Sequence, residues 1–303
     1  MDTVDIRARD LGRSQYGRVT RRQLIHDAGV SAATITRRLQ AGVWTEPVPG
    51  VVDLGSHDAS WRGRVQELVL GAGQGEAWAS HRTAGHLHRF LDLSRPERLD
   101  VVVLRERRRR LAGHRVHTTR SLGADEVTER HGLPCTTPAR TLLDLAMTTR
   151  PADLERWLLN LVRTDGRTLD ALATLLDRHR RLPGRRRLIE VANRIPAGAE
   201  SIGSPLEVLG IQELLDLGAP EFVLQYEVLD DGGIRVKRVD VAWPEHKVIV
   251  EFDGAAYHDL TDARRHDEQV RARLRALGWR VVVVRRADLG SGLLAALVRD
   301  LRG

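Results

Sequence analysis

Two alternating segments near the end of the chain restrict its fold more than any other feature of the sequence. Residues 234–243 and 247–253 both alternate between apolar and other side chains, which is the pattern of a β-strand. Residues 244–246, Pro-Glu-His, separate the two segments as a predicted turn, and Gly254 ends the second one. The sequence therefore predicts a β-hairpin in this region.

The predicted hairpin carries acidic residues on both strands. Glu251 and Asp253 share one face of the second strand, and the hairpin brings Asp240 on the first strand close to Glu251. Two neighbouring carboxylates repel each other, and a divalent cation commonly relieves that repulsion. We therefore expect Asp240 and Glu251 to bind Mg²⁺ or Mn²⁺. A surface hairpin with scattered acids is the alternative, but the apolar run 248–250 indicates a buried strand.

Helices and a further strand flank this hairpin in the sequence. A helix is predicted over Ser204–Leu217, because serine, proline and glutamate occupy its first positions. Glu207 has a purely local interpretation there, since it could close a capping box. A helix over residues 262–277, an apolar strand over 279–284 and a helix over 289–301 are predicted next. This order indicates an α/β layer arrangement.

The last hundred residues resemble the PD-(D/E)xK nucleases, in particular the very-short-patch-repair endonucleases. The resemblance implies a restriction-endonuclease-like mixed sheet flanked by helices, and metal-dependent hydrolysis of phosphodiester bonds. The combination of motifs is specific, although each motif alone is weak. The matching residues are Ser204–Glu207, Val239–Pro244, Val250–Gly254, Tyr257, His258, Asp267, Arg271, Leu274, Gly278 and Trp279.

The resemblance also implies a role for each acidic residue of the site. Glu207 is the acid supplied by the first helix, Asp240 is the first metal-binding acid, and Glu251 is the second. Asp253 occupies the position where the superfamily usually has a lysine, which makes the usual activation of water uncertain. His258 matches a histidine that takes part in catalysis, and imidazole titrates near neutrality, so His258 is the expected general acid or base.

The helix predicted over residues 262–277 supplies two supporting residues. Asp267 and Arg271 are four residues apart and are expected to pair on one helix face. Both match the nuclease motif. Arg271 could also hold phosphate, whereas a solvated helix face is the favoured interpretation for Arg264.

The beginning of the chain predicts a winged helix-turn-helix. Two short capped helices, over residues 20–28 and 31–41, are joined by a tight glycine turn and followed by a hairpin over 43–54. This pattern favours DNA binding in a major groove, and a small helical domain for protein contacts is the alternative. The residues expected to face DNA are Ser31, Thr34, Arg37 and Arg38.

The first half of the chain resembles the AbiEi-family antitoxins. The matching segments are residues 17–52, Ser80–Ala84 and Gly132–Ala146. The resemblance implies a winged helix that binds promoter DNA and represses its own operon. It thus implies an alternative function, a non-enzymatic regulator with a degenerate nuclease fold. It also implies a partner protein from a defence or toxin–antitoxin operon.

Length and charge fit this two-part interpretation. The chain has 303 residues, which suits two or three domains, and a formal charge of +7, which suits a nucleic-acid partner. Solubility alone could explain the charge. No residue distinguishes DNA from RNA as the substrate. The predicted division is a winged helix over 1–60, a middle α+β region over 61–180, a linker or boundary over 181–203 and the nuclease domain over 204–303.

Cysteine usage and hydropathy indicate a cytoplasmic protein. A single cysteine, Cys135, leaves no partner for an intrachain disulfide and favours a reducing compartment. No stretch of the sequence approaches the roughly 20 apolar residues that a membrane helix needs. The first ten residues lack the apolar core of a signal peptide.

Overall fold

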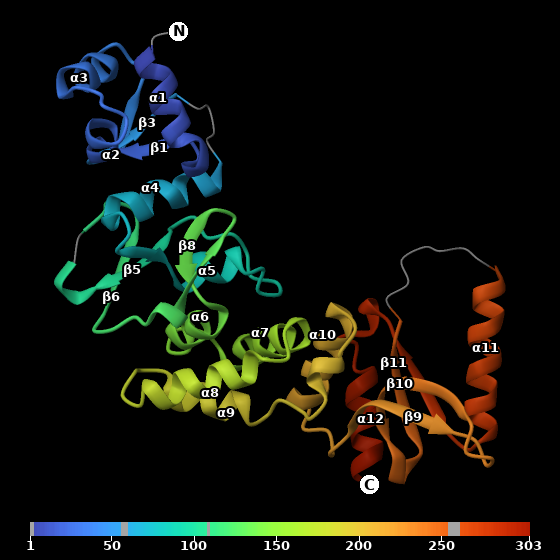
Figure 1. The fold of residues 1–303 in the computed structure, drawn as a ribbon. Coiled ribbons are helices and arrows are strands. Elements are labelled where there is room, and N and C mark those ends of the chain that lie inside the picture. The colour runs from blue at the N-terminus through green and yellow to red at the C-terminus, as the bar shows by residue number, and fades with distance from the viewer. Residues whose placement is uncertain (1–2, 56–59, 108–109, 254–260) are drawn as a thin grey trace. The chain divides into compact units, whose positions relative to one another are not determined.

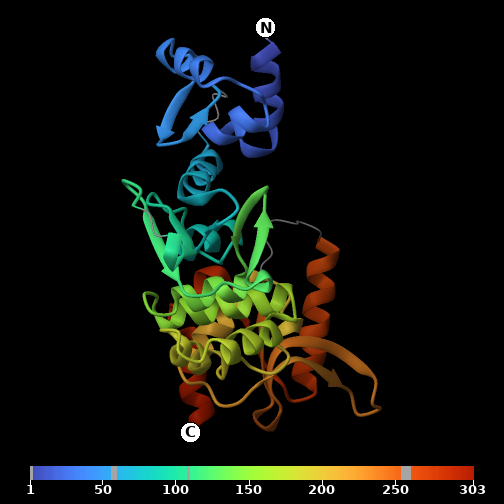
Figure 2. The ribbon, with the colours of Figure 1, turned by 60° about the vertical axis from the view of Figure 1, so that its left-hand side comes forward.

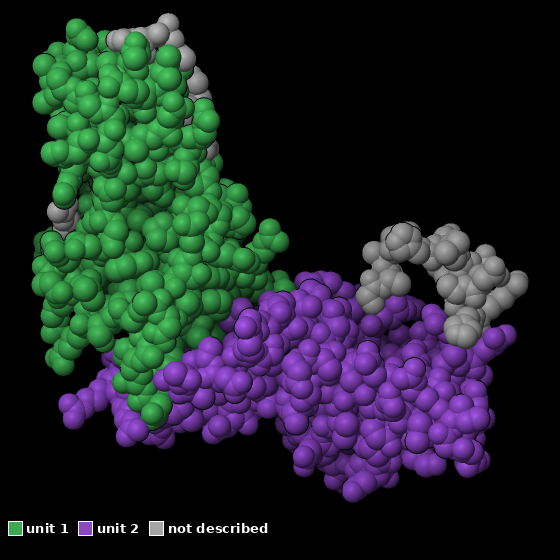
Figure 3. Space-filling model, viewed as in Figure 1, with its two compact units in different colours: residues 1–145, 175–179 green, residues 146–174, 180–303 purple. Residues whose placement is uncertain are grey.

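The chain folds into a mixed α/β structure, which confirms the α/β part of the predicted fold class (Figure 1). The computed structural model describes residues 3–55, 60–107, 110–253 and 261–303, with side chains from residue 267 onward in the last range. These residues contain three sheets. They divide into two compact units, which Figure 3 colours separately. Unit 1 comprises residues 1–145 and 175–179, and unit 2 comprises residues 146–174 and 180–303.

The first part of unit 1 combines helices with an antiparallel sheet of order β1-β3-β2. The two helices predicted from their caps are present. Thr20 and Gln23 form a capping box at α2, and the Ser31 side chain accepts from the Thr34 amide at α3. Gly50, with φ 84°, closes the predicted hairpin. The elements are α1 (Thr3–Gly12), β1 (Arg18–Thr20), α2 (Arg21–His26), α3 (Ala32–Gln40), β2 (Thr45–Val48) and β3 (Val51–Asp53).

The second part of unit 1 is a five-stranded mixed sheet of order β6-β5-β4-β8-β7. Apolar residues of α4 and α5 pack with β4, β5 and β8 into one buried cluster. Strand β4 is parallel to β8 and antiparallel to β5, whereas β5 is parallel to β6. The elements are α4 (Trp61–Gly73), β4 (Ala77–Ala79), α5 (His81–Leu87), β5 (Asp100–Leu104), β6 (Arg115–Thr119), β7 (Val127–Arg130), β8 (Leu133–Thr136) and α6 (Pro138–Leu145).

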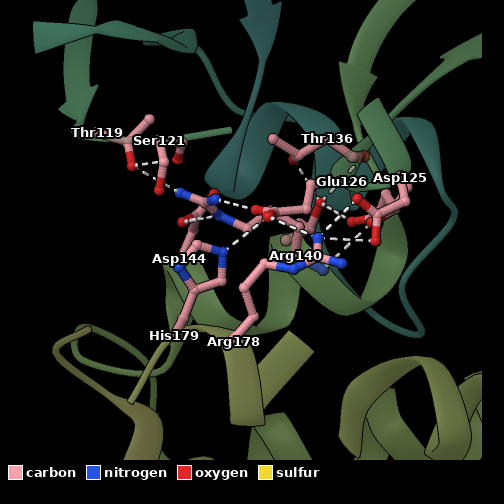
Figure 4. Close-up of polar contacts among 11 residues, drawn as sticks. Thr119, Ser121, Asp125, Glu126, Thr136, Arg140, Asp144, Arg178 and His179 are labelled. Atoms are coloured by element: carbon pink, nitrogen blue, oxygen red, sulfur yellow. Dashed lines mark hydrogen bonds and ion pairs between the residues drawn. The ribbon is translucent and has the colours of Figure 1, made fainter. Parts of the chain in front are cut away.

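A buried ion network links the end of this sheet to two helices of unit 1 (Figure 4). Arg140 on α6 donates to Glu126 and lies 2.9 Å from Asp144 through its Nε. His179 Nε2 lies 2.7 Å from Glu126 Oε1. Arg140 and Glu126 are 2% and 1% exposed, so these charges depend on one another for neutralisation. His179 belongs to residues 175–179, which are part of unit 1.

Unit 2 begins with a set of packed helices. They are α7 (Pro151–Thr164), α8 (Thr168–Arg178, whose last turn belongs to unit 1), α9 (Arg185–Ala192) and α10 (Pro205–Asp216). Helix α7 packs against α9 and α10. Residues 181–203, the predicted linker or boundary segment, contain α9, which buries Leu188 and Val191. The proline and glycine residues that suggested a linker lie at the ends of these short helices.

The second half of unit 2 is a four-stranded sheet of order β12-β11-β10-β9. The predicted hairpin is present as β10 and β11, with Val241 opposite Val250. Strand β12 runs parallel to β11. The elements are β9 (Val223–Leu229), β10 (Arg235–Trp243), β11 (Val248–Phe252), α11 (Thr261–Ala276), β12 (Arg280–Val284) and α12 (Leu293–Arg302). Strand β9 was not predicted, because this edge strand buries only Leu224 and Val228 and lacks a clean alternation.

Helices cover both faces of this sheet (Figure 1 and Figure 2). Leu274 of α11 packs with Ile249 on one face. Phe252, three residues further along β11, faces α10, where Gly210 permits a close approach. A Cβ at Gly210 would lie 1.9 Å from the Phe252 ring. The strand segment that carries the predicted acids is thus held between two helical layers.

Short 3-10 turns complete the fold, and one of them is the predicted turn of the hairpin. They are η1 (Arg13–Gln15), η2 (Arg105–Arg107), η3 (Ala124–Glu126), η4 (Ala199–Ser201), η5 (Pro244–His246) and η6 (Arg286–Asp288). Of the helices in the described parts of the chain, none has both the length and the apolar character needed to cross a membrane.

Candidate functional site

Asp240 lies where the ladder between β10 and β11 ends. The two strands pair from Trp243 opposite Val248 to Val241 opposite Val250. Asp240 is the neighbour of Val241 on β10, and its side chain accepts a hydrogen bond from the Phe252 amide on β11, with 2.8 Å between N and Oδ2. Strand β11 continues to pair with β12 as far as Phe252. The carboxylate therefore replaces a backbone acceptor and is held at this point by the sheet itself.

Gln225 on β9 connects Asp240 to Glu207 on α10. Its Nε2 lies 3.4 Å from Asp240 Oδ1 and 3.3 Å from Glu207 Oε2. Gln225 has a φ of 52°, a left-handed conformation that costs a residue with a side chain about 1–3 kcal/mol. Backbone strain of this kind is often retained at functional sites. Sequence reasoning missed Gln225, because a glutamine on an irregular edge strand gives no recognisable signal.

Glu207 is buried at the start of α10, where it does not close the predicted capping box. Its amide donates to the Ser204 side chain at 3.2 Å, so serine does cap α10. In a capping box the Glu207 carboxylate would accept from the amide of Ser204. It accepts instead from the amide of Gly203, at 2.8 Å. The same oxygen also faces Gln225. Glu207 thus stabilises the start of the helix and brings a second carboxylate toward Asp240.

The pKa of Asp240 is raised to about 6 from its ordinary value of 3.8. Burial is the largest cause, because it disfavours the charged form. The negative charges of Glu207 and Glu251 raise this pKa further, whereas the hydrogen bonds from Phe252 and Gln225 lower it. Burial and two neighbouring carboxylates thus disfavour the charged form of Asp240, and its hydrogen bonds offset this effect only in part.

Replacing Asp240 with asparagine should stabilise the metal-free protein more at pH 8 than at pH 5. Because the folded pKa is about 6 and the ordinary value is 3.8, the stabilising contribution of the protonated carboxyl is lost as the pH rises through about 6. At pH 8 the wild type therefore carries a cost of about 1–3 kcal/mol that asparagine removes. Urea unfolding in EDTA at both pH values measures it. Equal effects of the substitution at both pH values would contradict this explanation.

Glu251 is neutralised by cations from two elements. Lys237 on β10 places its Nζ 2.5 Å from Glu251 Oε1, and the Arg271 Nε on α11 lies 3.6 Å from Oε2. The Glu251 side chain is 8% exposed, so an unpaired charge there would be costly. Sequence reasoning missed Lys237, because the expected lysine position is two residues after Glu251. Lysine supplied from the neighbouring strand has no fixed sequence spacing.

The remaining predicted site residues have different positions. Asp253 is partly buried after β11, and its amide donates to the Val284 carbonyl at 2.9 Å. Asp267, the predicted support of Arg271, lies exposed on α11. His258 and Tyr257 lie outside the described residues, as does the side chain of Arg264. The proton-transfer role of His258 therefore stays a prediction.

The donor set at Asp240 fits a hard divalent cation in its chemistry. Carboxylate oxygens from Glu207, Asp240 and Glu251 are the ligands that Mg²⁺ and Mn²⁺ prefer, and a cation would balance the charges of Glu207 and Glu251 that add to the effect of burial on the pKa of Asp240. Among the side chains that the structure describes, however, no three His, Cys, Asp or Glu residues are gathered closely enough to bind a metal ion together. Glu251 would have to leave its ion pairs to join the other two.

The residues at α3 that are predicted to face DNA differ in their exposure and in their contacts. Arg37 is exposed, whereas Arg38 lies 3.0 Å from Asp5 on α1 and is only 21% exposed. The Ser31 and Thr34 hydroxyls hydrogen-bond to each other at the helix start, 3.0 Å apart. Arg37 is therefore the residue of this set best placed to reach a phosphate, and the Arg38–Asp5 ion pair attaches α3 to α1.

Comparison with known proteins gives no assignment of family. No family model matches the chain. Two Mycobacterium tuberculosis proteins described as uncharacterised, MT2308 of strain CDC 1551 and Rv2248 of strain H37Rv, are each 29% identical over 101 residues. These matches cover 33% of this chain and 37% of each relative, so the chain spans little more than a third of their length.

The crystal structure of the RV2827C protein from Mycobacterium tuberculosis aligns with a TM-score of 0.43 and 18% identity. That alignment covers 76% of this chain and 89% of the other, and a likeness this weak carries no argument.

Proposed function

We propose that the chain is a metal-dependent nuclease that hydrolyses phosphodiester bonds in DNA. In this proposal residues 204–303 are a PD-(D/E)xK domain of the very-short-patch-repair type, and residues 17–55 are a winged helix-turn-helix that binds the DNA. The observation that carries the proposal is the meeting of Glu207 and Asp240 at Gln225, with Glu251 near enough to raise the pKa of Asp240.

The residues of this site would have different roles in the proposed reaction. Asp240 and Glu251 would hold Mg²⁺ or Mn²⁺, with Glu207 orienting water or a second ion. A bound divalent cation would supply an acidified water molecule and neutralise charge on the transferred phosphate. Lys237 would offer the ammonium group that is missing at Asp253, and it would move from Glu251 toward a phosphate oxygen when the carboxylate turns to the cation.

Arg271 would hold the Glu251 carboxylate in position during this exchange. Its guanidinium approaches the second oxygen of the carboxylate, on the side opposite to Lys237. His258 would transfer the proton of the attacking water or of the leaving oxygen, as the resemblance implies. No residue of the site distinguishes ribose from deoxyribose, so RNA is a substrate to be tested alongside DNA.

DNA binding is proposed for the helix-and-hairpin part of unit 1. Two capped helices followed by a hairpin, with an exposed arginine on the second helix, support this proposal, because a winged helix-turn-helix combines the same elements. The formal charge of +7 supports a polyanionic partner. The proposed division of labour gives binding to unit 1 and cleavage to unit 2.

One observation favours a non-enzymatic function. Glu251 lies within ion-pair distance of two cations, Lys237 and Arg271, which is how a nuclease fold that has lost its metal would neutralise the remaining acid. The second candidate is therefore an AbiEi-type transcriptional regulator, with a partner from a defence or toxin–antitoxin operon. The two candidates predict opposite results in one assay.

The deciding experiment is incubation of the full chain with plasmid, single-stranded DNA and RNA. Each substrate is tested with Mg²⁺, with Mn²⁺ and with EDTA, and the melting temperature is measured under the same conditions. The nuclease proposal expects cleavage with a divalent cation, none with EDTA, and a metal-dependent rise in melting temperature. Absence of both cleavage and the rise would replace the nuclease with the regulator.

Arg37→Ala should weaken DNA binding on the order of tenfold and reduce its dependence on salt. A phosphate contact releases condensed counterions, so its loss should lower the slope of log affinity against log salt by about one. Binding to a short duplex across a salt series measures both quantities. Arg186→Ala is the matched control, because Arg186 is 94% exposed in unit 2. An unchanged salt slope for Arg37→Ala would remove α3 from the interface.

A further inference from the structure

Unit 1 contains a pocket that no part of the proposed nuclease uses. Its volume is about 390 Å³, at the lower end of the range of small-ligand pockets. The start of α4, the end of α5 with the segment after it, and the turn between β7 and β8 surround it. Buried Trp61, Leu87 and Phe90 line its interior, and the exposed residues Arg62, Arg89 and His131 lie among its walls.

Backbone strain is concentrated around this pocket. Arg89, Asp92 and His131 have φ values of 57°, 59° and 54°, and all three line it. They are three of the seven non-glycine residues with positive φ in the described ranges of the chain. The Tyr16 hydroxyl donates to the His131 carbonyl and so holds the strained turn. Strained backbone conformations are often retained at positions where the side chain has a function.

Positive charge converges on the same place. The pKa of His131 lies below its ordinary value, and partial loss of solvent is the largest cause. The positive charges of Arg62, Arg130 and Arg89 lower this pKa further. Guanidinium groups gathered around one point repel each other and favour an anion among them. The planar donors of arginine match a phosphate group in particular. Asp92, the acidic residue of the lining, offers an acceptor for hydroxyl or amino groups.

We propose that this pocket binds a free nucleoside monophosphate. The phosphate would lie between Arg62 and Arg89, and the base would rest on the apolar interior formed by Phe90 and Leu87. Asp92 would accept from the sugar or the base. A volume of about 390 Å³ suits one nucleotide, and binding of a longer strand by its end is an outcome that the test distinguishes.

Two variants test the pocket with little risk to the fold. Arg89→Gly removes a guanidinium from the pocket and leaves a residue that adopts a φ of 57° without strain. Arg62→Glu reverses a charge on an exposed position of α4. Arg22→Glu on α2 is the matched control, because it makes the same charge change at an exposed position of unit 1 outside the pocket lining.

Titration calorimetry of the full chain gives the readout. The probes are the four nucleoside 5′-monophosphates, adenosine, inorganic phosphate and a 5′-phosphorylated oligonucleotide. The expected result is saturable one-to-one binding of at least one monophosphate, with adenosine and phosphate at least tenfold weaker. Arg62→Glu and Arg89→Gly should each weaken that binding at least tenfold, and Arg22→Glu should change it less than twofold.

Three results would overturn the proposal. The first is no saturable binding of any monophosphate by the wild type. The second is binding that survives both pocket variants while their melting temperatures stay at the wild-type value. The third is Arg62-dependent binding of the oligonucleotide without binding of a monophosphate, which would assign the pocket to a strand end. The outcome is independent of nuclease activity, because the candidate acids lie in unit 2 and the pocket lies in unit 1.

Discussion

Asp240→Asn should lower the rate of metal-dependent cleavage about a hundredfold or more. The substitution keeps an oxygen that can accept from the Phe252 amide, so the end of the β10–β11 ladder retains its hydrogen bond. It removes the negative charge that would attract the cation and, through it, stabilise the charge that develops on the phosphate. Losing one such electrostatic contact typically costs two to three orders of magnitude in rate.

The measurement is single-turnover cleavage of a plasmid with Mn²⁺, at enzyme concentrations that saturate the DNA. Asp300→Asn is the matched control, because it makes the same change of charge in unit 2 on a side chain that is 57% exposed and pairs with Arg280. The control should cleave at the wild-type rate, and both variants should bind DNA with wild-type affinity. Wild-type cleavage by Asp240→Asn would falsify the site assignment.

Arg140→Ala should destabilise unit 1 by about 3–5 kcal/mol, the usual cost of removing one partner from a buried ion pair. Burial is the largest influence on Glu126 and by itself would raise its pKa, but hydrogen bonds from His179 and Arg140 hold that pKa below its ordinary value. Burial raises the pKa of Asp144, and Arg140 is the cation that opposes this rise. Without Arg140, two buried carboxyl groups lose their main counter-charge (Figure 4).

The loss should be localised to one part of the chain. Hydrogen exchange followed by mass spectrometry, at increasing urea, reports unit 1 and unit 2 separately, whereas a single melting temperature would mix them. Arg186→Ala is the control, because its partner Glu190 is 61% exposed and such pairs contribute about 0.5 kcal/mol or less. Comparable changes in both variants would mean that the network in unit 1 contributes little to stability.

Short-range patterns in the sequence are sufficient to predict the secondary structure around the candidate acids and the helix proposed to bind DNA. Alternation over residues 234–253 is sufficient to predict β10 and β11, because a strand exposes successive side chains to opposite faces. Serine caps at Ser31 and Ser204 predict the starts of α3 and α10, because the cap is a contact between near neighbours. The acids Asp240 and Glu251 were identified for the same reason, as members of a short pattern.

Tertiary structure alone decided which side chains meet. Gln225 reaches Asp240 and Glu207 because β9 adds to the sheet edge, although its own sequence barely alternates. Lys237 neutralises Glu251 from another strand, at a spacing that no motif specifies. Pairing across strands depends on register and backbone distortion, and both are set by the packing of the whole unit.

The same distinction applies to unit 1. Its second capped helix was predicted from residues within one turn, but the ion pair that attaches Arg38 to Asp5 joins residues 33 positions apart. His179, which follows α8, joins Glu126 across 53 positions. Sequence by itself determined the helices, the hairpin and the candidate acids, since their signals are local. The charge partners, the strained pocket and the division into units were decided only by folding, since each depends on contacts between distant residues.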